Sequence, residues 1–181
     1  MIAKLISIAA AALLIAADQG IKTWATARLL PVEAMPLIPG LVEFRYVLND
    51  GMAFSMLAGK QGLLIGVTSI MLAAVLIWLL VGKMNLLERT AWTLVFGGGI
   101  GNLIDRVLNG VVVDYINLLC MRFAVFNFAD ICVCVGVGLL VLSILLDGIQ
   151  QKEKAGLPSN QSVKECGSPE DGIEKKKDEN I

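Results

Sequence analysis

Four aspartates carry the chemical possibilities of this sequence, because each stands at or near the end of an apolar run: Asp18, Asp105, Asp114 and Asp130. Two carboxylates held close together cannot both stay ionised, so they share a proton. Such a pair can act as base toward water and as acid toward a leaving amine. The chain contains no histidine, which removes the Ser-His and Cys-His nucleophilic arrangements. Paired carboxylates are therefore the natural hydrolytic chemistry for these residues.

An amide stands three residues before two of these carboxylates, in Asn102-x-x-Asp105 and Asn127-x-x-Asp130. At helical spacing the amide lies beside the acid and can hold its orientation and its proton. The residues alone do not decide which two aspartates form the pair, and Asp105 is as eligible as the others. The alternative is structural, with each Asp capping a helix or pairing with a base at a membrane interface. The bases available for this are Lys22, Arg106 and Arg122.

The composition places these acids in a membrane protein. Apolar residues make up 56% of the chain and the mean hydropathy is +0.74, far above an ordinary soluble domain. Gly62–Val81 is uncharged and has the roughly 20 residues needed to cross about 30 Å of hydrocarbon. Shorter runs at Leu5–Ala17, Thr90–Ile104 and Ile131–Leu146 can span only if their polar ends lie near an interface. Four spans would leave both termini on one side.

The N-terminal run has two interpretations. Lys4 followed by an apolar stretch and small residues is typical of a secretory signal peptide. Asp18 and Lys22 favour a retained helix instead, because an acid four residues before a base lies on the same helical face in a favourable order.

The segment Val42–Leu48 alternates apolar and polar residues, which predicts a half-buried strand. It leads into Asn49-Asp50-Gly51, a turn signal in which Gly51 can adopt a positive φ. This is either an ordinary hairpin turn or a device that places Asn49 over the carboxylates as a substrate clamp.

The remaining local patterns indicate packing and a solvated tail. The run Gly97–Gly101 lacks the Lys and Ser/Thr of a phosphate loop, so its small-xxx-small spacing predicts close helix packing. Cys132 and Cys134 are two residues apart. If this segment is helical, their side chains point in different directions and do not converge on one metal.

We predict a domain over residues 1–148 and a charged, disordered cytoplasmic tail over 149–181.

Five segments, taken together and in order, resemble one family. They read DQGIK at Asp18–Lys22, NDGMAFS at Asn49–Ser55, GGGIGNLIDR at Gly97–Arg106, VVVDY at Val111–Tyr115 and FNFAD at Phe126–Asp130. This combination resembles lipoprotein signal peptidase, also called signal peptidase II, over about residues 1–148. Five linked motifs are far more specific than any one of them.

The resemblance implies an all-α membrane protein with four transmembrane helices and a small extracytoplasmic β-cradle, in the bacterial inner membrane with both termini cytoplasmic. It implies an aspartyl endopeptidase that removes the signal peptide from diacylglyceryl-modified prolipoproteins, just before the lipidated cysteine and near the extracytoplasmic face. By motif, Asp114 and Asp130 match the catalytic pair. Positions that support the site or bind substrate are matched by Asp18, Lys22, Asn49, Gly51, Asn102, Asp105, Arg106 and Asn127.

The expected partners are lipid-modified prolipoprotein signal peptides and membrane lipids, with no nucleic acid, metal or cofactor, and the chain is expected to act as a monomer. The expected mechanism is attack by a water polarised between the aspartates, through a tetrahedral intermediate. Asp50 and Met52 depart from the usual residues of the family, so local substrate contacts are expected to differ. The alternative is a small four-helix proton- or cation-coupled transporter, although such carriers place their acids near mid-span.

Overall fold

The computed structural model describes residues 1–51 and 60–156. Met52–Ser55 of the NDGMAFS motif and residues 157–181 of the predicted tail lie outside the described residues. The chain divides into two compact units, Met1–Leu146 and Asp147–Ile181. The sheet and the site described below belong to the first unit. The second contains the end of the last helix, so the tail boundary at residue 149 stays a prediction.

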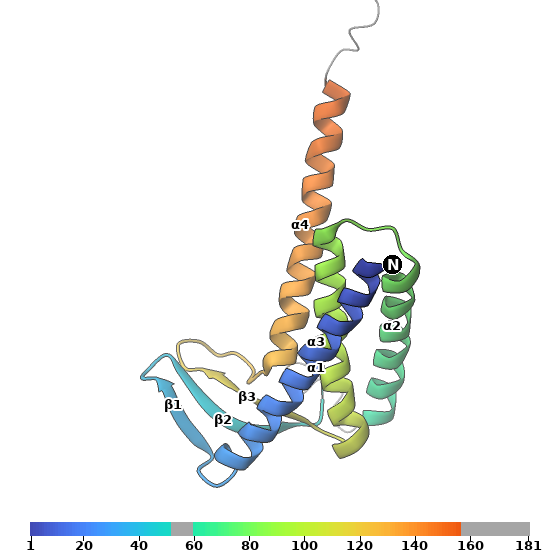
Figure 1. Cartoon of the computed structure of the whole chain (residues 1–181). Helices are drawn as coiled ribbons and strands as arrows, with labels where there is room; N and C mark the ends of the chain where they lie inside the picture. Colours follow the sequence, from blue (N-terminus) through green and yellow to red (C-terminus); the bar gives the residue numbers. More distant parts are fainter. Residues whose placement is uncertain (52–59, 157–181) are drawn as a thin grey trace, which may run out of the picture. The chain divides into compact units, whose positions relative to one another are not determined.

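Four helices contain the four predicted apolar runs (Figure 1): α1 (Ile2–Leu29), α2 (Gln61–Val81), α3 (Leu86–Asn109) and α4 (Phe128–Gly156). Asp18 and Lys22 both lie on helix α1, and whether this helix is retained stays a prediction. A capping box starts α3, in which the Asn85 side chain and the Glu88 side chain exchange hydrogen bonds with each other's backbone N–H. Gly110 ends α3 in the left-handed conformation, with φ 71°.

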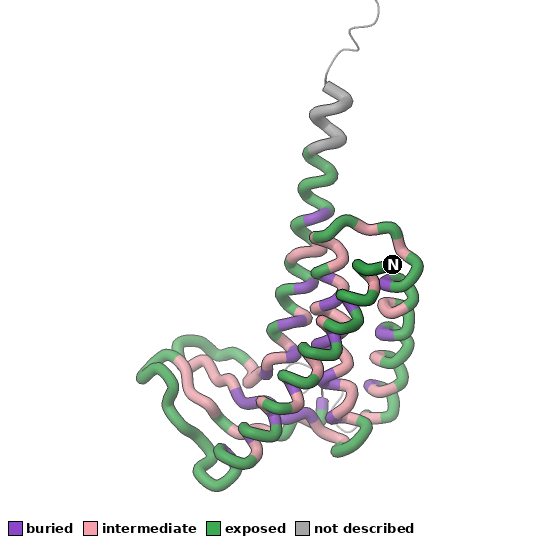
Figure 2. The backbone as a smooth tube through the Cα atoms, viewed as in Figure 1, coloured by how far each residue is buried: buried purple, intermediate pink, exposed green. Residues whose placement is uncertain are grey.

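Three helices of the described chain are long and apolar enough to cross a membrane: α1, α2 and the part of α4 over Phe128–Ile149. Helix α3 contains the fourth predicted run but also carries charges at both ends, and it is not among these candidates. Large apolar residues such as Ile70 and Ile144 are exposed, and exposed residues recur along the helices (Figure 2). Such exposed apolar faces fit contact with hydrocarbon rather than water.

Helix α3 packs against the other three helices through the glycine run. A Cβ on Gly97 would lie 3.0 Å from the Leu14 side chain of α1, and one on Gly99 would lie 2.5 Å from the Leu72 side chain of α2. Gly98 faces the Ala129 carbonyl of α4. The predicted close packing is confirmed, because a Cβ at Gly98 would collide with the Ala129 backbone and one at Gly97 or Gly99 would displace a leucine side chain.

A three-stranded antiparallel sheet lies at one end of the helical bundle (Figure 1), in the order β1 (Ala34–Ile38), β2 (Val42–Asn49) and β3 (Val112–Leu118). The predicted strand at Val42–Leu48 is confirmed as β2. An isolated bridge between Ile116 and Phe126 brings the residues before α4 alongside β3. The fold is therefore mostly helical with a small sheet.

The sheet packs on the C-terminal part of α1. Ala25 and Leu29 of α1 form a buried cluster with Val113 and Tyr115 of β3. Phe44 of β2 extends this cluster, with its ring in edge contact with Trp24 and tilted against Tyr115. These contacts fix β3, and with it Asp114, relative to α1.

The first prediction concerns the α3–α4 contact. We expect Gly98→Ala to destabilise the protein by about 1–3 kcal/mol, because the new methyl group meets the Ala129 backbone, which cannot rotate away. Thermal unfolding of purified protein in detergent measures this. The control is Gly138→Ala on α4, where an added Cβ meets nothing within 4 Å. Equal unfolding temperatures for the two variants would contradict the tight α3–α4 contact.

Candidate active site

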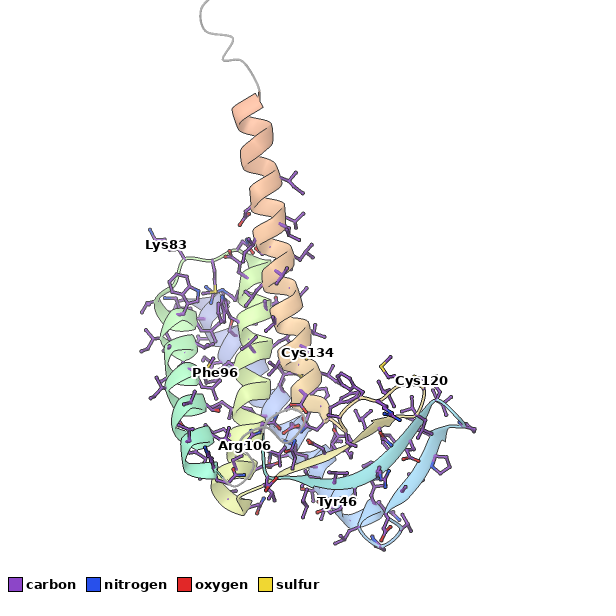
Figure 3. The ribbon with its side chains drawn as sticks, turned by 180° about the vertical axis from the view of Figure 1, so that it is seen from behind. Tyr46, Lys83, Phe96, Arg106, Cys120 and Cys134 are labelled. Atoms are coloured by element: carbon purple, nitrogen blue, oxygen red, sulfur yellow. The ribbon has the colours of Figure 1, made fainter. Side chains whose placement is uncertain are left out.

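The four aspartates come from four different elements and meet where the bundle joins the sheet. Asp18 comes from α1, Asp105 from α3, Asp114 from β3 and Asp130 from α4. Figure 3 shows Arg106 at this end of the molecule and Lys83 at the opposite end of the bundle. The site is therefore built by tertiary structure rather than by any one segment.

Lys22 forms ion pairs with two of the carboxylates. Its Nζ lies 2.9 Å from Asp18 Oδ2 and 3.0 Å from Asp105 Oδ2, and all three residues are buried. Gln19 adds hydrogen bonds from Nε2 to Asp105 Oδ1 (3.0 Å) and Asp18 Oδ2 (3.3 Å). A buried charge is tolerated when it is paired and hydrogen-bonded, and each member of this group meets that condition.

Two asparagines connect the Lys22 group to the other two aspartates. Asn102 Oδ1 accepts hydrogen bonds from Lys22 Nζ (2.8 Å) and Asn127 Nδ2 (3.1 Å), while Asn102 Nδ2 donates to Asp130 Oδ1 (2.8 Å). Asn127 Nδ2 also donates to Asp114 Oδ1 (2.6 Å). Because Lys22 can only donate, it fixes the orientation of the Asn102 amide and leaves its NH₂ group for Asp130.

The first turn of α4 is held by side chains from three sources. Phe128 N–H donates to the Tyr115 hydroxyl (3.1 Å), Ala129 N–H to Asp18 Oδ1 (3.1 Å) and Asp130 N–H to Asn127 Oδ1 (3.0 Å). Asn127 N–H donates in return to Asp130 Oδ2 (3.1 Å). This is a capping-box arrangement with Asp in place of the usual Glu. One oxygen of Asp130 thus caps the helix, while the other accepts from Asn102.

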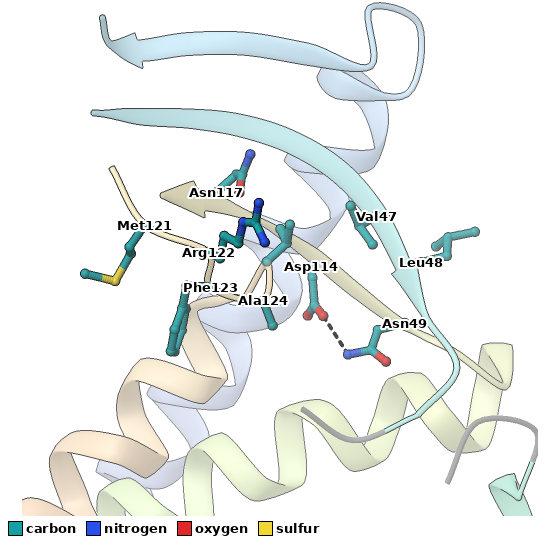
Figure 4. Close-up of a pocket in the computed structure, with 10 residues that line it drawn as sticks. Val47, Leu48, Asn49, Asp114, Asn117, Met121, Arg122, Phe123 and Ala124 are labelled. Carbon is teal, nitrogen blue, oxygen red and sulfur yellow. Dashed lines mark hydrogen bonds between the residues drawn. The ribbon is translucent and has the colours of Figure 1, made fainter. Parts of the chain in front are cut away.

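Asp114 is 2% exposed and is held by two amides. Oδ1 accepts from Asn127, and Oδ2 accepts from Asn49 Nδ2 at 2.9 Å (Figure 4). Burial raises the pKa of Asp114 to about 6, the nearby Asp130 carboxylate raises it as well, and the two amide hydrogen bonds oppose the shift. This pKa allows Asp114 to gain or lose a proton near neutral pH.

The predicted turn after β2 lies over Asp114. Gly51 N–H donates to Asn49 Oδ1 (2.9 Å), which forms an Asx-type turn, but Gly51 does not adopt the positive φ that the sequence suggested. Arg106 secures the turn, with Nη2 donating to the Gly51 carbonyl (3.1 Å) and Nη1 to the Asn102 carbonyl (3.4 Å). Of the two interpretations of this segment, the bond from Asn49 to Asp114 fits the one that places Asn49 over a carboxylate, and a contact with substrate stays a prediction.

A cavity of about 560 Å³, which we call the bundle cavity, opens onto Asp114 and Asp130. Its other polar lining comes from Asn49, Asn102 and Arg106, and apolar side chains of α2, α3 and α4 form most of the remaining wall. Such a space suits an apolar ligand with one polar group placed at the carboxylates.

The ten predicted site residues all lie in this region, in two linked groups. Asp18 and Asp105 do form the ion pairs considered in the structural alternative, whereas Asp114 and Asp130 both line the bundle cavity. Arg122 makes no ion pair within the part of the chain that the structure describes. In those residues no group of three or more His, Cys, Asp or Glu side chains is arranged to hold a metal ion.

Sequence reasoning missed Gln19 and Tyr115. Gln19 stands between the apolar run and Lys22, directly after Asp18, and this position beside a charged pair is the signal that could have identified it. Tyr115 looked like an ordinary strand residue. Its hydroxyl acquires a partner only because the bridge between Ile116 and Phe126 brings the start of α4 to β3.

The sequence is similar to known peptidases over most of its length. The family model described as Signal peptidase (SPase) II matches residues 10–146. The lipoprotein signal peptidase of Brucella ovis is 44% identical over 133 residues, covering 71% of this chain and 82% of its own. That of Streptococcus pyogenes serotype M2 is 38% identical over 133 residues, covering 73% of this chain and 88% of its own.

Two solved structures of bacterial membrane enzymes share the fold. One superposes with a TM-score of 0.73 at 31% identity and covers 90% of this chain and 94% of its own. The other has a TM-score of 0.71 at 31% identity and covers 77% of this chain and 92% of its own. The likeness therefore extends to the sheet as well as the helices.

Proposed function

The chain belongs to the signal peptidase II family, and we propose that it is an aspartic endopeptidase that removes the signal peptide from diacylglyceryl-modified prolipoproteins, just before the lipidated cysteine. The family and the apolar helices make the protein a membrane-bound protease. The single observation that carries the aspartic assignment is that Asp114 and Asp130 line one cavity and are joined through Asn127. The transporter alternative finds no support in the relatives.

The proposed reaction uses the two carboxylates as a proton-sharing pair. The ionised carboxylate takes a proton from a water that attacks the scissile carbonyl carbon. The protonated carboxyl group donates a hydrogen bond to the developing oxyanion and then gives its proton to the leaving amine. The pKa of Asp114, raised to about 6 by burial and by the Asp130 carboxylate, suits such an exchange. Asn102 and Asn127 hold the two acids through hydrogen bonds to their oxygens.

The bundle cavity supplies the apolar environment that a signal peptide needs. A signal helix entering from the membrane would meet the side chains of α2, α3 and α4 before its scissile bond reaches the carboxylates. Asn49 is bonded to Asp114 and lines the same cavity, so it can contact the substrate backbone. Arg106 supports this arrangement by holding the turn at Gly51.

We place the protein in the bacterial inner membrane as a monomer with α3 as a fourth span. The buried Asp105 and the contacts of α3 with α1, α2 and α4 support this, because its polar end is compensated inside the protein. The site then lies near the extracytoplasmic face beside the sheet, and both termini lie in the cytoplasm.

The second prediction tests the pair. Asp114→Asn and Asp130→Asn should each lower cleavage of a diacylglyceryl-modified precursor by roughly 10²-fold to 10⁴-fold, since an amide cannot exchange the required proton. Asp105→Asn should cost less, because Asp105 pairs with Lys22 and does not line the cavity. Precursor cleavage followed by mass spectrometry measures all three. Full activity in Asp114→Asn or Asp130→Asn would refute the assignment.

The third prediction concerns pH. The Asn49 amide stabilises the ionised form of Asp114 and so lowers its pKa. Asn49→Ala should therefore raise the pKa of Asp114 further above about 6, and the limb of the kcat/KM profile that Asp114 controls should move to higher pH. Asn109→Ala is the control, because Asn109 is exposed at the end of α3. If this limb of the profile stays in place or moves to lower pH in Asn49→Ala, Asp114 is not the group that controls it.

Tyr115 is proposed as a positioning residue for Asp130. Its buried side chain follows Asp114 directly in β3, and its hydroxyl accepts the first N–H of α4. Burial raises the pKa of Tyr115 to about 12, so the hydroxyl stays neutral at working pH. One residue thus connects the strand that carries Asp114 to the helix that carries Asp130.

The fourth prediction follows from this contact. Tyr115→Phe should lower kcat about fivefold, the value of a single neutral hydrogen bond, leave KM nearly unchanged, and lower the free energy of unfolding by only about 1 kcal/mol. Tyr46→Phe is the matched control, because Tyr46 packs on the same cluster and its hydroxyl makes no hydrogen bond within the described residues. A purely structural role would show instead as a lower unfolding temperature with normal kcat for the folded fraction.

A further inference from the structure

A second cavity also borders Asp114 and is lined by the sheet and the segment that leads to α4. It measures about 670 Å³, and we call it the sheet cavity (Figure 4). Its lining comes from β2, β3 and residues 121–125. Asn49 and Asp114 line both cavities, as do residues 123–125. The two spaces therefore adjoin at the carboxylate that is proposed to act on the substrate.

A peptide bond held at Asp114 has chain on both sides of it, and each side needs room. The bundle cavity, enclosed by three helices, suits the apolar signal peptide. The polypeptide that follows the cysteine must leave in another direction, and the sheet cavity begins at the same carboxylate. It is also the space with an exposed cation on its wall, which fits a polar chain better than a hydrocarbon chain.

The charge on this wall is that of Arg122. Asp114 is the other charged residue of the lining, and its oxygens are held by Asn49 and Asn127. Arg122 is exposed and forms no ion pair within residues 1–51 and 60–156. Glu43 of β2 does not line this cavity and accepts a hydrogen bond from Asn117 Nδ2 at 2.7 Å. The guanidinium is thus available to a carboxylate brought in by the substrate.

We propose that the sheet cavity receives the first residues of the polypeptide after the lipidated cysteine, and that Arg122 favours an acidic side chain among them. This inference rests on the proposed peptidase function and adds a substrate preference to it. An exposed ion pair contributes at most about 1 kcal/mol, which corresponds to about fivefold in kcat/KM.

The experiment uses the full chain in vesicles of neutral lipid, with three synthetic precursors that carry a diacylglyceryl-modified cysteine. The precursors differ only at the second and third positions after the cysteine, which hold Asp, Gln or Lys. Wild type should cleave the Asp precursor about fivefold faster than the Lys precursor at low salt. Arg122→Glu should reverse this order, and Arg122→Gln should abolish it.

Arg45→Gln is the matched control, because Arg45 is exposed on β2 but does not line the cavity; it should keep the wild-type order. An unchanged order in Arg122→Glu would overturn the inference. So would an equal effect of Arg122→Glu on all three precursors that depends on added anionic lipid, since this would assign Arg122 to the membrane surface. Cleavage without any charge preference overturns the inference alone, whereas failure to cleave any precursor overturns the proposed function with it.

Discussion

The buried Lys22 ammonium is the interaction on which the rest of the site depends. It lies between Asp18 and Asp105 and also donates to Asn102. Taking such charges out of water is costly. Removing one partner of a buried pair leaves the other charge without a partner and lowers the stability of the folded protein by about 3–5 kcal/mol. Lys22 fixes the orientation of the Asn102 amide. In that orientation Asn102 donates a hydrogen bond to Asp130 and accepts one from Asn127. Asp18 also accepts from the first turn of α4, so the same group places the helix that carries Asp130.

The packing of the helices makes this charge cluster possible. A Cβ at Gly101 would lie 2.5 Å from Asp18 Oδ2, so a larger residue would displace the carboxylate that pairs with Lys22. The neighbouring glycines hold α3 against α2 and α4 in the same way. The glycine run therefore has two effects. It closes the helix contacts, and it leaves room for a polar group inside a bundle whose outer surface is apolar.

The sequence predicted the elements well and the pairing of the acids poorly, for a physical reason. Apolar runs and alternation are local signals, so the helices and β2 could be located. Asp18 pairs with Lys22 four residues away, at a helical spacing. It also accepts a hydrogen bond from Ala129, 111 residues away, and shares Lys22 with Asp105, 87 residues away, and neither of these separations is a local pattern. Which acids line the bundle cavity depends on the register of β3 against β2 and on the bridge between Ile116 and Phe126. The choice of Asp114 with Asp130 came from family resemblance, and no local pattern would have singled out the Tyr115 hydroxyl.

The position of Asp130 at the first turn of α4 has a consequence for biosynthesis. Chains emerge from the ribosome in order, and their N-terminal parts fold first. The Lys22 group can assemble from α1 and α3 before α4 is made, because its members all precede residue 110. Asn127 and Asp130 arrive afterwards and complete the network. The charge cluster of a nascent chain can thus form before the residues that connect Asp114 and Asp130 through Asn127 have been made.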